Sequence, residues 1–309
     1  MTHTWQTLLE QQSQLNNADL NLETSRFIPL DHLSVLTVSG DEAASFLQNL
    51  LTNDVNALNN NQGQLSGFCN AKGRLFAIFI LIRRDNAFQI IIEKSMSTLL
   101  LQRLSMYILR SKVTIKDDAD NTVCLGLIPI EEYQDATTLS IKLNRTTPQY
   151  LVTSSHAQAE ALCQHLTQQG WQLGSQTQWQ QAEIAAGIPA VIPETKESFT
   201  PQQVNLDLID GVSFSKGCYP GQEIVARLHY LGTPSRRLFA AKVHSNQTIV
   251  IGSPIVNADN ITVGHCVSSN TIDNSTSLLL SLKLSGIEQD LFLSTGEIIS
   301  ELQQLHAKD

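Results

Sequence analysis

The chain lacks the clustered cysteines that a metal site of the usual kind requires. Its five cysteines are scattered over 309 residues, at Cys69, Cys124, Cys163, Cys218 and Cys266. No C-x-x-C pair and no Cys/His cluster at ligand spacing occurs, which argues against a zinc or iron–sulfur site built by one chain. An odd cysteine count without a secretory signal fits a reducing compartment. We therefore expect a cytoplasmic protein with no resident metal.

Long apolar runs and an excess of basic charge are also missing. The longest apolar run, residues 75–82, is too short to span a bilayer. Lys and Arg number 20 against 29 Asp and Glu, so the net charge is −9. A chain this acidic is a poor non-specific ligand for phosphate backbones. We expect a soluble protein that binds neither a membrane nor, extensively and directly, a nucleic acid.

The apolar patterns that are present predict an α+β fold. Strand-like segments are expected at 33–38, 65–70, 74–82, 88–93, 113–116, 123–130 and 149–153, and helices at 3–16, 95–109, 157–169 and 176–186. Helices and strands alternate here without the regular rhythm of a doubly wound sheet. After residue 233 nearly every pattern is strand-like, at 237–243, 249–251, 261–267, 277–284 and 291–293. This predicts a body over residues 1–233, possibly in two subdomains, and a small antiparallel β-barrel over residues 234–309.

The most distinctive stretch runs from residue 210 to residue 232. Alternation of apolar residues with serines predicts a short strand at 212–214, and a helix is expected after Gly221. Pro220 suits the first turn of that helix. Cys218 would then lie just before a helix N-terminus, with Lys216 two residues upstream. Both the helix dipole and the ammonium would favour a thiolate. The alternative is a small residue buried in a tight turn, and the spacing alone does not decide between them.

The segment Lys-Gly-Cys-Tyr-Pro-Gly-Gln-Glu, residues 216–223, resembles the K-G-C-[FY]-x-G-Q-E signature of the YgfZ family. These are folate-binding proteins related to the aminomethyltransferase (T-protein) of the glycine cleavage system. Residues 40–55 are similar to the opening of the aminomethyltransferase-like domain, and residues 186–189 to the stretch ahead of the cysteine motif. The resemblance implies an aminomethyltransferase-like folate-binding body with a C-terminal antiparallel β-barrel.

The resemblance also implies a function. The protein would be a folate-binding accessory factor that supports the assembly or repair of iron–sulfur enzymes and the modification of tRNA, in particular methylthiolation. Its cofactor would be tetrahydrofolate or another reduced folate, and its partners iron–sulfur proteins such as tRNA methylthiolation enzymes. Cys218 would be the functional thiol, aided by Lys216, with no independent catalytic turnover. One alternative is a tetrahydrofolate-dependent aminomethyltransferase, and another is a binding module that uses the fold only as a scaffold.

Trp179 is the candidate folate contact. In an otherwise polar helix, a large aromatic side chain is either a core anchor or a stacking surface for a flat ligand. By resemblance it matches a tryptophan associated with folate binding, and Leu33 stands where the family has a second aromatic residue. The chain departs from the family at Ala185, where many relatives carry a glutamate associated with the pterin ring.

Overall fold

The computed structural model describes residues 4–15, 23–133, 140–143, 145, 148–232, 234–245 and 249–306. The chain divides into two compact units. The first unit comprises Met1–Ala44, Ala57–Gln64 and Ile80–Ala182, and the second Ser45–Asn56, Leu65–Phe79 and Glu183–Asp309. The chain thus passes between the units several times before residue 183. The boundary expected at residue 233 stays a prediction.

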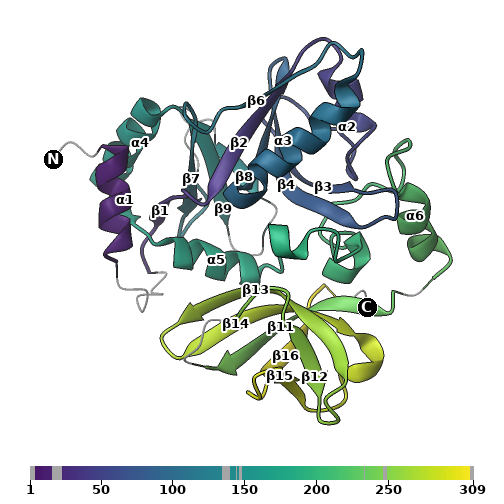
Figure 1. The fold of residues 1–309 in the computed structure, drawn as a ribbon. Coiled ribbons are helices and arrows are strands. Elements are labelled where there is room, and N and C mark those ends of the chain that lie inside the picture. The colour runs from purple at the N-terminus through teal and green to yellow at the C-terminus, as the bar shows by residue number, and fades with distance from the viewer. Residues whose placement is uncertain are drawn as a thin grey trace. The chain divides into compact units, whose positions relative to one another are not determined.

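The first unit contains a five-stranded sheet with two helices against it (Figure 1). The strand order is β10-β1-β7-β9-β8, with β1 (Arg26–Pro29), β7 (Val123–Ile128), β8 (Ser140–Leu143), β9 (Gln149–Ser154) and β10 (Gln172–Leu173). Helices α1 (Trp5–Ser13) and α4 (His156–Gln168) bury Trp5, Leu8 and Cys163 in one cluster with this sheet. Ser155 caps α4 with a capping box, so its start follows from local chemistry. Strands β1, β8 and β10 were not anticipated, and they are short.

A second sheet has the order β3-β4-β5-β2-β6. Its strands are β2 (Leu33–Ser39), β3 (Gly63–Cys69), β4 (Leu75–Arg84), β5 (Ala87–Glu93) and β6 (Thr114–Asp117). Helix α3 (Lys94–Ile108) packs on β2, β5 and β6, as Figure 1 shows. The expected hairpin of β3 and β4 is confirmed. In its turn, the side-chain oxygen of Asn70 accepts bonds from the backbone N–H groups of Lys72 and Arg74.

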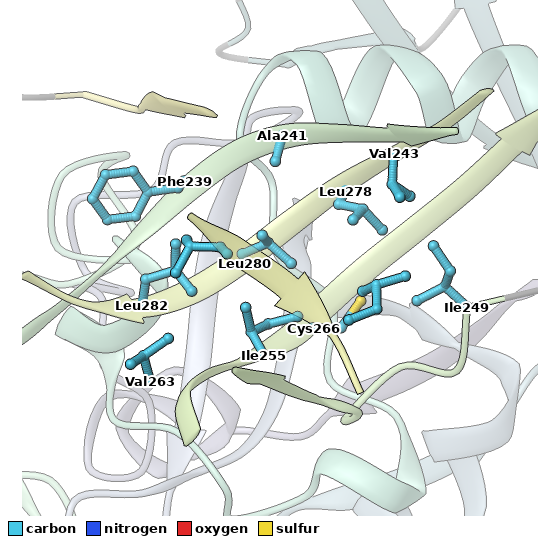
Figure 2. Close-up of a cluster of buried hydrophobic side chains, with 12 residues drawn as sticks. Phe239, Ala241, Val243, Ile249, Ile255, Val263, Cys266, Leu278, Leu280 and Leu282 are labelled. Carbon is cyan, nitrogen blue, oxygen red and sulfur yellow. The ribbon is translucent and has the colours of Figure 1, made fainter. Parts of the chain in front are cut away.

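The C-terminal strands form an antiparallel six-stranded half-barrel, as expected, and the α+β class is confirmed. The order is β15-β12-β13-β14-β11-β16, with β11 (Arg236–His244), β12 (Pro254–Asn257), β13 (Thr262–Ile272), β14 (Ser275–Lys283), β15 (Leu291–Leu293) and β16 (Ser300–Gln304). One face of the sheet buries a hydrophobic cluster that includes Phe239, Leu280, Leu282 and the sulfur of Cys266 (Figure 2). Burial of such apolar area is the main stabilising term for this sheet.

One barrel strand was placed wrongly. The residues at 249–251 form no strand; they lead into a turn in which Ser253 N–H donates to the carbonyl of Val250. The apolar pair Ile249 and Val250 resembles a strand in sequence, but Ile249 is a core residue of the turn and Val250 is exposed. Two strands that were not expected complete the sheet instead: β12 pairs with β13, and β16 pairs with β11. None of the helices in the described part of the chain is long and apolar enough to cross a membrane.

The remaining helices are short. They are α2 (Ala43–Gln48), α5 (Gln176–Ala185), α6 (Gln222–Tyr230) and the 3₁₀ turns η1 (Pro193–Thr195), η2 (Pro201–Val204) and η3 (Leu284–Gly286). Within the second unit, the residues of the cysteine motif contact the end of α2 and the β3–β4 turn, and they lead into α6.

Candidate functional site

Residues 210–221 form an irregular loop, so the strand expected at 212–214 was wrong. Within 212–214, Ser213 N–H donates to the carbonyl of Thr52 at 3.0 Å. The Thr52 hydroxyl donates to the carbonyl of Gly211 at 2.7 Å and accepts from Gly67 N–H at 2.8 Å. Thr52 is fully buried. It ties the start of the loop to β3, a role that sequence spacing did not indicate.

Lys216 anchors the middle of the loop. Its ammonium donates to three backbone carbonyls at and just beyond the end of helix α2: Gln48 at 2.6 Å, Leu51 at 2.5 Å and Asn53 at 3.1 Å. The last carbonyls of a helix lack partners within the helix and attract cations. A lysine ammonium has three N–H donors. All three are therefore used to hold the loop to the end of α2.

This placement changes the role expected for Lys216. Burial lowers the pKa of Lys216 to about 8, and the nearby carboxylate of Asp54 opposes that shift. The ammonium also lies 5.3 Å from the centroid of the Tyr219 ring, within cation–π range. Because its protons are taken by carbonyls, Lys216 has none left to donate to the sulfur of Cys218. Any effect on the thiolate must come from its charge.

Cys218 faces outward between two inward anchors. Lys216 is 8% exposed and Tyr219 is 7% exposed, whereas Gly217 and Cys218 are exposed. A Cβ atom built on Gly217 would meet nothing within 4 Å, so the surface beside Cys218 is bare. All four other cysteines are buried. The loop therefore presents a single thiol to solvent, which favours the reactive reading of Cys218 over a small residue buried in a turn.

Gly221 fixes the start of helix α6. It is the N-cap residue and has a φ of +78°, in the left-handed region that favours glycine. A Cβ atom built on Gly221 would lie 2.4 Å from the carbonyl oxygen of Asn70 and 2.5 Å from the nitrogen of Gly73. Helix α6 thus begins where its backbone is in contact with the backbone of the β3–β4 turn, which leaves no room for a side chain at residue 221. Pro220 lies just before this cap, and not in the first turn as expected.

Alanine substitutions at the two glycines should separate packing from surface effects. We expect Gly221→Ala to lower the free energy of unfolding by at least about 2 kcal/mol, because a left-handed alanine and a backbone clash are both unfavourable. Gly217→Ala is the matched control and should change it by less than about 0.5 kcal/mol, as an exposed substitution. Urea unfolding followed by circular dichroism measures both. Equal stability of the two variants would contradict the packing seen at Gly221.

An aromatic cluster joins the loop to the end of α6. The rings of Phe214 and His229 are stacked, with centroids 3.6 Å apart and planes 13° apart. Tyr230 packs edge-on against both rings, and it and Leu231 are 65% and 83% exposed. No role was expected for His229 and Tyr230. Alternation alone could not reveal that they pack on Phe214, because the contact depends on the path of the loop.

The expected folate residues Trp179 and Leu33 belong to the first unit. Trp179, on α5, is 1% exposed, and a Cβ atom built on Gly126 would lie 2.6 Å from two of its ring carbons. Its ring is therefore packed against backbone, as for a core anchor. Its indole N–H is buried and meets no hydrogen-bond acceptor in the described part of the chain. Leu33 begins β2 and is half-buried, opposite Glu93. Ala185 ends α5 and is exposed.

The chemistry available at the loop is that of one accessible thiol. Among the described residues, no three His, Cys, Asp or Glu side chains gather closely enough to hold a metal ion. A thiolate at Cys218 can attack a disulfide, bind a metal or accept the outer sulfur of a persulfide, which releases a thiolate. In each case the other reactant, or the remaining metal ligands, must come from a second molecule.

Comparison with known proteins identifies the relatives of this chain. Residues 21–128 match the GCVT N-terminal domain. The tRNA-modifying protein YgfZ of Edwardsiella ictaluri is 34% identical, covering 68% of this chain and 69% of that protein, and the one from Escherichia coli is 32% identical over 68% and 69%. The crystal structure of glycine cleavage system aminomethyltransferase T from Bartonella henselae superposes with a TM-score of 0.70 at 13% identity, covering 93% of this chain and 87% of that chain. The fold is thus aminomethyltransferase-like, and the chain belongs to the YgfZ family.

Proposed function

We propose that this protein supports tRNA modification as an accessory factor for iron–sulfur enzymes, and that Cys218 is its functional group. The observation that carries the proposal is the single exposed thiol on a loop anchored by Lys216 and Tyr219. An ordinary structural cysteine would be buried like the other four. The curated relatives are named as tRNA-modifying proteins, which supports the same role here.

The geometry limits what Cys218 does alone. Iron–sulfur clusters usually take four cysteine ligands, and the loop supplies one. A cluster at Cys218 would therefore be shared with a partner that provides the remaining ligands. In thiol–disulfide exchange, the thiolate would attack a partner disulfide, forming a mixed disulfide and releasing the other sulfur as a thiolate. Sulfur transfer to the thiolate would start from the persulfide of a partner, whose other sulfur would leave as a thiolate, and reaction with a folate-bound one-carbon unit is a fourth route. The first two routes predict a transient complex through Cys218.

Complementation tests the role in tRNA modification. A bacterial strain without its own homologue should contain less methylthiolated nucleoside in its tRNA, and this chain should restore it. Mass spectrometry of digested tRNA measures the ratio of methylthiolated to unmodified nucleoside. Failure of the expressed, folded protein to restore that ratio would contradict the proposal.

A reduced folate is the proposed cofactor, and one feature of the first unit supports it. None of the described residues supplies an acceptor to the buried indole N–H of Trp179, and leaving such a donor unsatisfied costs about 1–3 kcal/mol. An oxygen or nitrogen of a folate would supply the acceptor. Because the ring is packed on Gly126, we expect Trp179 to contribute through its N–H and not through an open ring face. Bound folate supplies a carrier for one-carbon units.

Trp179→Phe should weaken the binding of a reduced folate about tenfold, since it removes one buried hydrogen bond and keeps most of the packing. Titration with 5-formyltetrahydrofolate, followed by calorimetry, measures the dissociation constant. Wild-type protein should also show quenching of tryptophan fluorescence, and Trp171→Phe is the matched control that keeps Trp179. Unchanged affinity of Trp179→Phe would remove Trp179 from the folate site.

The alternative function is aminomethyl transfer to tetrahydrofolate, which the shared fold favours. It makes a different prediction in one assay. The accessory role predicts no release of ammonia from an aminomethyl-carrying donor protein in the presence of tetrahydrofolate. Sustained release over many turnovers would establish the transferase instead.

A further inference from the structure

A second site lies in the C-terminal part of the second unit, where a cavity of about 330 Å³ opens beside the half-barrel. Its lining comes from the segment around η1 and η2 and from strands β11, β13 and β14. The lining includes Glu194, Ser198, Gln203, Arg236, His265 and Ser281. None of them belongs to the cysteine motif, so the site does not depend on the function proposed for Cys218.

Strand register gathers the polar side chains on one face. Ser281 of β14 lies opposite Leu238 of β11 and His265 of β13. Side chains directly opposite each other share a face, and so do residues two apart on one strand. Arg236, two residues before Leu238, therefore shares that face with Ser281 and His265. The hydroxyl of Ser281 donates to the carbonyl of Gln203 at 2.9 Å, so this face is covered by the η2 segment. The apolar cluster of Figure 2 occupies the opposite face.

Arg236 carries an unsatisfied donor. Its Nε–H is buried and finds no hydrogen-bond acceptor among the residues that the structure describes. Among the described residues, neither Glu194 nor any other carboxylate lies within 4.0 Å of its guanidinium in an ion pair. The neighbouring Arg237 differs, because it pairs with Asp207 at 2.7 Å. A guanidinium presents planar donors that match the oxygens of phosphate and carboxylate groups.

His265 adds a second donor to the same cavity. Burial and the charge of Arg236 both lower the pKa of His265. Two groups that can each carry positive charge thus face one space, and Glu194 on η1, an exposed residue, is the one carboxylate of the lining. An anion in this space would pair with the guanidinium of Arg236 and would favour the protonated form of His265. It would also give the Nε–H of Arg236 an acceptor.

We propose that this cavity binds a small oxyanion, a phosphate or carboxylate group, between Arg236 and His265. Ser198, whose side chain is exposed at the lining, adds a hydroxyl. The volume accommodates such a group together with a modest attached body, so the ligand is either the free ion or the charged end of a small metabolite.

The test is a nuclear magnetic resonance titration of the His265 imidazole in the full chain. Potassium phosphate should shift its Hε1 signal in a saturable way and raise its pKa, because a bound anion stabilises the imidazolium. Potassium acetate distinguishes a carboxylate site from a phosphate site, and potassium chloride at equal ionic strength controls for screening. The same shift with chloride, or no response to either oxyanion, would overturn the proposal.

Variants locate the site. Arg236→Gln should weaken the response at least about tenfold, the effect of losing a charge-assisted hydrogen bond. The exposed Arg110→Gln is the matched control and should bind as the wild type does. If Arg236→Gln fails to fold by circular dichroism, His265→Gln with calorimetric detection tests the same cavity. Wild-type affinity in folded Arg236→Gln or in His265→Gln would overturn the assignment.

Discussion

Limiting iodoacetamide at neutral pH should alkylate Cys218 at least about 100-fold faster than any other cysteine. Burial raises the pKa of Cys69, Cys124, Cys163 and Cys266 from 9.0 to about 12. Since the thiolate is the nucleophile, each of these thiols is about a thousandfold less populated in its reactive form than an ordinary thiol. They are also shielded from the reagent. Peptide mass spectrometry of short reactions gives the relative rates.

The control for that experiment is the unfolded chain. In concentrated denaturant all five cysteines should react at similar rates, because burial no longer distinguishes them. Labelling of another cysteine before Cys218 in the folded protein would show that the loop does not present the most reactive thiol, and the proposed role of Cys218 would fail.

Lys216→Met should lower the free energy of unfolding by about 3 kcal/mol. The substitution keeps the apolar stem and removes the ammonium that holds the carbonyls of Gln48, Leu51 and Asn53. Hydrogen bonds to charged groups contribute about 1.5–3 kcal/mol each, and losing the desolvated charge offsets part of their sum. The matched control is Lys242→Met, since Lys242 makes an exposed pair with Glu301 that is worth about 0–1 kcal/mol. Equal urea midpoints for the two variants would mean that the anchor contributes little.

Local patterns were sufficient for much of the fold. The β3–β4 hairpin was predictable because a long apolar run, a glycine turn and a second apolar run are all local features. The half-barrel followed from repeated short strands separated by turn residues. The short strands β1 and β10 escaped prediction because their pairing partners lie far along the chain, and pairing rather than sequence makes them strands.

The site was predictable only in part. The helix after Gly221 was predicted from the pattern and Cys218 was singled out by the resemblance, but neither the exposure of Cys218 nor the direction of Lys216 follows from the spacing. Its acceptors stand 163 to 168 residues earlier in the chain, and no spacing rule reports such a distant contact. The expected strand at 212–214 failed because Phe214 stacks on His229 instead of joining a sheet.

The sequence pattern and the family resemblance predicted different roles for Trp179. The sequence pattern allowed a core anchor, and its ring is buried as that interpretation requires. The resemblance pointed to folate. The indole N–H, which has no acceptor among the described residues, is the group that we expect to donate to a bound folate. The sequence could not separate these roles, because burial and hydrogen bonding depend on the packing of α5 against Gly126.

The most direct test of the role of Cys218 is a panel of single Cys→Ser variants in cells that lack the endogenous homologue. The ratio of methylthiolated to unmodified nucleoside in tRNA is measured for each variant, with its folate affinity determined on purified protein. Cys218→Ser should lose restoration of the ratio while it keeps wild-type folate binding and fold, and the four buried-site variants that remain folded should restore it. Full restoration by Cys218→Ser would contradict the claim that the exposed thiol carries the function.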